Sequence, residues 1–232
     1  MRKIFVLFLI ACYFNTCKNE QKAKPALQKI ILSKDPALID YVKCKDSIAQ
    51  LRKSLKSNWG KMPLAEKERI FVKSVTQTII PPWLGTGWDF NGITEEPGKG
   101  KIACGYFVTT VLRDAGVKLN RVKLAQCASS EMIRSLVAVK NIHSFYYRSF
   151  EAFYEFIASN GFGLYIIGLD NHTGFIYHNG KDIYFIHSNF AGPKSVQQEK
   201  VSDSWILKGS GCHIVGKIST DARLLNSWCG NN

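Results

Sequence analysis

Residues 172–188, HTGFIYHNGKDIYFIHS, decide the fold class that we expect for this chain. Two runs rich in aromatic and β-branched residues flank Asn179-Gly180, and an Asn-Gly pair between such runs is the strongest short signal for a β-hairpin. Similar runs at 163–169 and 211–218 predict two further strands. We therefore expect an antiparallel sheet in the C-terminal part of the chain.

The chain before this hairpin has a helical pattern. Residues 65–80 are amphipathic and end at Pro81-Pro82, which cannot continue a helix. After a glycine-rich loop at 83–100, a second helix begins at Cys104, with apolar residues three, four, seven, eight and eleven positions later and Gly116 placed as a C-terminal cap. Further helices are expected at 129–139 and 149–160. Helices followed by an antiparallel sheet define an α+β fold.

The hairpin also brings two histidines together. If Asn179 and Gly180 form a two-residue loop, His172 lies directly opposite His187, with the two Cβ atoms about 5 Å apart. His178 lies on the same face but about 20 Å along the strand, so it is excluded from a site at His172. A one-residue slip of the register would turn one of the pair to the other face.

Cys104 is the candidate nucleophile beside this pair. The backbone N–H groups at a helix N-terminus stabilise a thiolate, so we expect a lowered pKa, and an imidazolium would lower it further. The small neighbours Ala103 and Gly105 would let a substrate carbonyl approach. A cysteine, a histidine base and a group that orients the histidine form the arrangement of nucleophilic catalysis. The alternative is a cysteine buried in the core of the helix.

Five segments in order resemble the NlpC/P60 family of papain-like cysteine peptidases, which cut peptidoglycan stem peptides. Their pattern is a G-T-x-Y-x-x-G-G loop, a D-C-S-G-F-V helix start, a P-R turn, an H-V-G strand and an I-H-A strand. The corresponding residues here are GTGWDFNG at 85–92, ACGYFV at 103–108, Asn120-Arg121 with Gln126, HTGF at 172–175 and IHS at 186–188. The resemblance implies a papain-like fold, in which N-terminal helices precede a nucleophile helix packed on an antiparallel sheet.

The resemblance also implies roles for single residues. Cys104 would be the nucleophile, His172 the base and His187 the group that orients it, with Asn189 as the alternative orienting residue. The oxyanion and substrate region would hold Trp88, which replaces a tyrosine, together with Asp89, Ala103 and Gly105. Ala103 stands for the family's aspartate and Gly105 for its serine, so the specificity is expected to differ.

The N-terminus has the pattern of an export signal. Met1-Arg2-Lys3 precedes a short apolar run, which is too short to span a bilayer as a permanent anchor. Residues 1–17 resemble a bacterial lipoprotein signal, with Cys17 as the favoured lipidation site and Cys12 as the alternative. This pattern predicts a membrane-anchored lipoprotein of the cell envelope, periplasmic or at the outer membrane. An ordinary cleaved signal is the alternative interpretation.

The chain is basic, with a net charge of +13. Residues 18–73 hold 14 basic and 6 acidic residues, a net charge of +8. We expect residues 18–80 to form a basic helical segment packed on a catalytic domain at 81–232. Such a charge suits anionic lipid or cell-wall polymers, and export argues against nucleic acid.

The cysteines bear on metals and disulfides. No C-x-x-C or H-E-x-x-H pattern occurs, so we expect no metal and no cofactor. Outside the signal the cysteines number five, so at least one stays unpaired in an oxidising compartment: Cys44, Cys104, Cys127, Cys212 and Cys229. Sequence separation makes Cys212 and Cys229 the nearest plausible disulfide but cannot establish it.

These features predict an exported, monomeric cysteine amidase or peptidase, with cell-wall peptide as the expected substrate. Transfer of the acyl group to an amine instead of water is equally compatible with the sequence. The alternative class is a non-catalytic papain-like module that binds an envelope component or confers immunity.

Overall fold

The computed structural model describes residues 41–146 and 150–230. Residues 1–17, which we interpret from the sequence as an export signal, lie outside the described residues together with Cys12 and Cys17. The helices are α2 (Tyr41–Leu55), α3 (Leu64–Lys73), α4 (Cys104–Asp114), α5 (Arg121–Gln126), α6 (Ser129–Leu136), α7 (Phe150–Asn160), α8 (Trp205–Gly209) and α9 (Ala222–Cys229). Short 3₁₀ turns occupy Trp59–Lys61, Pro81–Trp83, Val139–Asn141 and Val201–Asp203, and a π-helical turn occupies Ser74–Ile79.

Six strands form one antiparallel sheet, in the order β1-β6-β2-β3-β4-β5. They are β1 (Ile142–Tyr146), β2 (Gly163–Gly168), β3 (Thr173–His178), β4 (Ile183–Ser188), β5 (Val196–Lys200) and β6 (Cys212–Lys217). The expected α+β class is confirmed. Four strands were predicted, whereas the two edge strands β1 and β5 were not.

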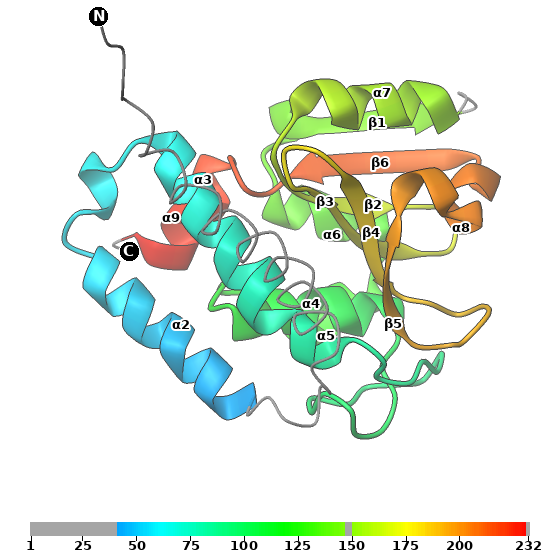
Figure 1. The fold of residues 1–232 in the computed structure, drawn as a ribbon, viewed down its shortest axis with the longest axis horizontal. Coiled ribbons are helices and arrows are strands. Elements are labelled where there is room, and N and C mark those ends of the chain that lie inside the picture. The colour runs from blue at the N-terminus through cyan, green and yellow to red at the C-terminus, as the bar shows by residue number, and fades with distance from the viewer. Residues whose placement is uncertain (1–40, 147–149, 231–232) are drawn as a thin grey trace, which may run out of the picture.

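The central strands of the sheet are buried on both faces, because successive residues of one strand enter two different clusters. Leu164 and Ile166 of β2 pack with the helical side of the molecule, whereas Tyr165 and Ile167 pack with α7 and α8. In Figure 1, α7 and α8 lie at the opposite end of the molecule from α2, α3 and α9.

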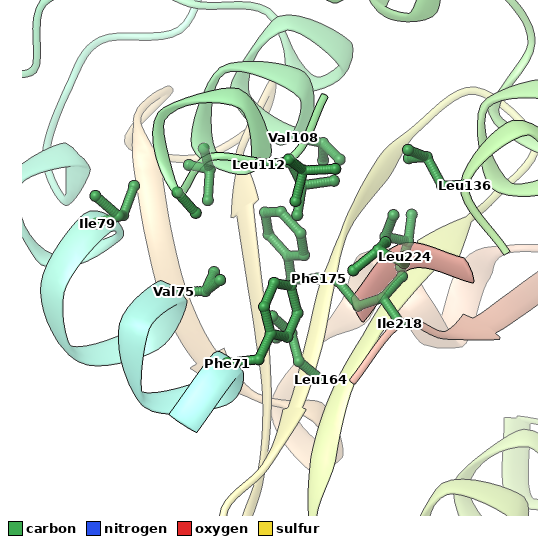
Figure 2. Packing of buried hydrophobic residues seen from close by; sticks show 14 of the residues in the cluster. Phe71, Val75, Ile79, Val108, Leu112, Leu136, Leu164, Phe175, Ile218 and Leu224 are labelled. Atoms are coloured by element: carbon green, nitrogen blue, oxygen red, sulfur yellow. The ribbon is translucent and has the colours of Figure 1, made fainter. Parts of the chain in front are cut away.

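The helical segment before Pro81 packs on the rest of the chain through a shared core. Figure 2 shows Phe71, Val75 and Ile79 directed toward Val108 and Leu112 of α4 and toward strand residues, all of them fully buried. The predicted apolar stripe of α4 is thus confirmed, and Gly116 has the left-handed φ of 99° expected of a C-terminal cap. The helix predicted at 65–80 continues through the π-helical turn and does end at the two prolines.

The hairpin has a register that differs from the predicted one by two residues. The side chain of Asn179 accepts the N–H groups of Lys181 and Asp182, which moves the turn onto Gly180 and Lys181. His178 therefore pairs with Ile183 rather than Lys181. Because the shift is an even number of residues, every side chain keeps its predicted face.

No helix of the described residues is both long and apolar enough to cross a bilayer.

Candidate active site

Cys104 is the first residue of α4, and two tethers fix its position. The N–H of Ala103 donates to the carbonyl of Gly92 over 2.8 Å, which ties the helix start to the glycine-rich loop. The buried hydroxyl of Ser188, next to His187, donates to the carbonyl of Ile102 over 2.6 Å. The second tether links the end of β4 to the start of α4, so the candidate nucleophile and the histidine pair are held together.

His172 immediately precedes β3 and lines a cavity wall together with Cys104. Both residues border the same two cavities, and the backbone N–H of Thr173, the next residue, reaches the Cys104 sulfur. The imidazole of His172 is 5% exposed and meets the rings of Phe185 and Phe190 edge to face. The predicted neighbours Cys104 and His172 are therefore brought into one site.

The two histidines are joined by a direct hydrogen bond. His172 Nε2 and His187 Nδ1 are 2.8 Å apart, although the shifted register makes the residues diagonal rather than directly opposite. The other ring nitrogen of His172, Nδ1, is buried and has no hydrogen-bond partner among the described residues. Asn189, the alternative orienting residue, instead donates to Gln197 Oε1. The structure thus joins His187, not Asn189, to His172.

Gly174 makes room for this pair. A Cβ at this position would lie 2.8 Å from the Cβ of His187 and 2.7 Å from the ring of Phe185. The ring of Phe185 stacks under the imidazole of His187 at a centroid distance of 3.9 Å. The glycine of the HTG sequence is therefore needed because a side chain at this position would clash with His187 and Phe185.

Glu199 on β5 completes the chain of polar groups, and the sequence reasoning missed it. Its Oε1 lies 3.4 Å from Nε2 of the fully buried His187. This distance is longer than an ideal hydrogen bond, and Nε2 has no hydrogen-bond partner among the described residues, so the Glu199 carboxyl is the polar group that faces it. The strand VQQEK at 196–200 is polar and short, so only its alternating pattern could have pointed to a residue facing His187.

Burial keeps both imidazoles neutral at neutral pH. Desolvation, together with the neighbouring His187, lowers the pKa of His172 to about 3. Desolvation also lowers the pKa of His187, although Glu199 opposes that shift. Since neither ring carries a charge, the pair can accept a proton when a reaction supplies one.

The expectation of a lowered pKa for the Cys104 thiol is wrong. Burial raises the pKa of Cys104, and it outweighs the backbone N–H groups of Thr173, Gly105 and Cys104 itself, which lower it as expected. Ala103 at the N-cap makes no side-chain cap, so it does not compete for these N–H groups. The resting site is a neutral thiol beside a neutral imidazole.

Two cavities meet at Cys104 and His172. One cavity has a volume of about 580 Å³, and its polar lining residues include Ser129, Ser130 and Asp170. The other, of about 720 Å³, is more aromatic and includes Trp88, Tyr106 and Phe190. A substrate lying across the thiol could therefore place one part in each cavity.

The predicted substrate residues are only partly at this site. Trp88, Ala103 and Gly105 line the aromatic cavity, whereas Asp89 lines neither cavity and instead accepts from the N–H of Asn91 and pairs with Lys101. A Cβ on Gly105 would overlap the carbonyl oxygen of Ala125. The close approach of α5 thus requires this glycine, which is a structural reason beyond access for a substrate.

The structure also places His178 and the cysteine pair that the sequence suggested. His178 accepts the N–H of Gly180 and lines neither cavity. Cys212 and Cys229 are free thiols on β6 and α9, so the suggested disulfide between them is absent. Within the described residues, no three histidine, cysteine or acidic side chains gather as a metal site would need.

Comparison of this chain with protein-family models, with curated proteins and with solved structures finds no match.

Proposed function

We propose that this chain is a cysteine amidase or peptidase of papain-like, NlpC/P60 type, in which Cys104, His172 and His187 act together. The observation that carries the proposal is the 2.8 Å bond between His172 Nε2 and His187 Nδ1, which leaves Nδ1 of His172 unpartnered at the wall shared with the thiol. A buried ring nitrogen without a partner, on a residue that lines the same cavities as a thiol, is free to take a proton from that thiol.

The reaction begins with the neutral pair. As the Cys104 sulfur attacks an amide carbonyl, its proton moves to Nδ1 of His172 and the new S–C bond forms. The imidazolium then gives this proton to the leaving amine, and the C–N bond breaks. Water, deprotonated by the same ring, cleaves the thioester and restores the thiol. If an amine attacked the thioester in place of water, the acyl group would be transferred to that amine.

Charge on the tetrahedral oxyanion develops near the N-terminus of α4. The N–H groups of Cys104 and Gly105 already lie at the sulfur, and no side chain of the N-cap residue competes for them. These donors, with the dipole of an 11-residue helix, would stabilise the oxyanion. The indole of Trp88, on the wall of the aromatic cavity, is the candidate second donor.

Peptidoglycan stem peptide is the substrate that we propose, within an exported, lipid-anchored protein of the cell envelope. The proposal is supported by the export pattern, the resemblance of segments 85–92 and 172–175, and the basic N-terminal region. Ala103 and the tightly packed Gly105 remove two polar groups of the family's pocket, so the cleaved bond is expected to differ from the usual one.

The test is digestion of purified sacculi, with products identified by mass spectrometry. Wild type should release peptides, and Cys104→Ala should release none while keeping the same circular dichroism spectrum. Cys229→Ala is the matched control, because it removes a thiol that lines neither cavity. Equal cleavage by wild type and Cys104→Ala would refute the proposed mechanism.

The second candidate is a non-catalytic binding or immunity module, and the raised pKa of Cys104 is the observation that favours it. Such a module would bind an envelope component equally well with or without the thiol. Unchanged binding by Cys104→Ala, with no product from wild type on any peptide or amide tested, would select this candidate.

A further inference from the structure

Glu199 is the charged group next to the histidine pair, and it lies outside the substrate cavities. It lies on β5, paired with Phe185 of the neighbouring strand β4, so it is on the same face of the sheet as His187. Its side chain is 27% exposed, and it lines neither cavity at Cys104. Direct contact with a substrate is therefore not its role, and any effect on catalysis must pass through His187.

The carboxyl of Glu199 is held in its ionised form. Burial on its own would raise its pKa, but the neighbouring His187 ring at 3.4 Å and a hydrogen bond from the Ser204 hydroxyl together outweigh burial and lower the pKa. Ser204 also accepts the N–H of Leu207 as the N-cap of α8, so its hydroxyl is fixed in place. An ionised carboxylate can only accept hydrogen bonds, so the nitrogen facing it must carry a proton.

This requirement passes through both rings. A proton on Nε2 of the neutral His187 leaves Nδ1 as a lone pair. Because His187 Nδ1 and His172 Nε2 are 2.8 Å apart, one of them must donate, and that donor is now His172 Nε2. A neutral His172 with its proton on Nε2 has a lone pair on Nδ1, which is the form that can take a proton from Cys104.

The opposite arrangement would disable the site. With the proton on Nδ1, His187 would donate to His172 and turn an Nε2 lone pair toward the Glu199 carboxylate, where the two would repel. His172 would then carry its proton on Nδ1 and could not accept one from a thiol. The two arrangements differ in how His187 meets the charge of Glu199.

We propose that Glu199 is a positioning residue that fixes both histidines in the tautomer needed for catalysis, through the chain Glu199–His187–His172–Cys104. The inference rests on the proposed function for its catalytic consequence, but the tautomers themselves can be measured without turnover. Glu199 acts at a distance from the reacting atoms, so kcat should fall and KM should stay constant when it is altered.

The experiment combines ¹⁵N NMR of labelled histidines with kinetics, in wild type, Glu199→Ala and Glu199→Gln. Wild type should show His172 and His187 both protonated at Nε2. Glu199→Ala should give a mixture of tautomers and a kcat lower by about 10–100-fold. Glu199→Gln should retain the tautomers and most of kcat, because its amide oxygen still accepts a hydrogen bond. Asp203→Asn, which removes an exposed charge nearby, should change neither measurement.

The outcomes separate this inference from the proposed function. Wild-type tautomers and wild-type kcat in Glu199→Ala would overturn the inference, and so would a Gln variant as impaired as the Ala variant in both measurements. If wild type shows the expected tautomers and Glu199→Ala loses them, but wild type cleaves no amide, the positioning holds and the proposed function fails.

Discussion

Lowering the pH from 7 to 5 should destabilise the protein through His172. Its pKa is about 3 in the folded protein, whereas the ordinary value of 6.5 applies to the unfolded chain. Between these two values the unfolded chain binds a proton that the folded protein does not, so the free energy of unfolding falls as the pH falls. At pH 5 the unfolded imidazole is almost fully charged, which corresponds to a loss of about 2 kcal/mol relative to pH 7.

The assay is urea unfolding followed by tryptophan fluorescence, at both pH values, for wild type and His172→Gln. The variant keeps an amide near His187 but cannot titrate. The other buried histidines titrate in both proteins, so the difference isolates His172. Wild type should lose about 2 kcal/mol more than the variant on acidification. An equal loss in the two proteins would refute the reasoning that His172 is buried in its neutral form.

Three further predictions concern the construction of the site. Gly174→Ala should lower the free energy of unfolding by about 1–3 kcal/mol through overpacking against the histidine pair, whereas Gly60→Ala, with open space around it, should not, as measured by urea unfolding. Ser188→Ala leaves a buried carbonyl without its donor and should cost about 1–3 kcal/mol, with a lower kcat as the tether of α4 is lost. The rate of Cys104 alkylation by iodoacetamide should still be rising at pH 9, since the pKa of this thiol is raised.

Each of these has an outcome that contradicts it. A stable, active Gly174→Ala variant would mean that the sheet relaxes easily around the histidines. A Ser188→Ala variant with unchanged stability and kcat would show that the tether is dispensable. Alkylation that reaches a plateau in mild acid would show a preformed thiolate, contrary to a neutral resting pair.

The helices and central strands could be predicted because their signals are local. The apolar stripe of α4 and the runs of β2, β3 and β4 are set by spacing within one segment. The register of the hairpin could not be predicted in this way. The side chain of Asn179 binds the N–H groups of Lys181 and Asp182, which moves the turn by one residue and the strand pairing by two. The pairing of His172 with His187 survived this error only because the shift preserved the faces.

Glu199 shows what the sequence could not supply. Its strand β5 has the pattern VQQEK, with only Val196 apolar, because it is an edge strand whose outer residues remain exposed. Glu199 lies next to His187 because β5 pairs with β4, and no local sequence pattern encodes which strands pair. The prediction of a lowered pKa for Cys104 was wrong for a similar reason. The sequence shows that this residue begins a helix, but it does not show how deeply the thiol is buried.

Acylation of Cys104 is the sharpest test of whether this thiol is a nucleophile activated by His172. Wild type and His172→Ala would be mixed with an activated ester, quenched in acid at short times, and mapped by peptide mass spectrometry. We expect a thioester at Cys104 that forms at least about 100-fold faster in wild type than in His172→Ala. Acyl groups spread over the other cysteines, or equal rates in the two proteins, would contradict it.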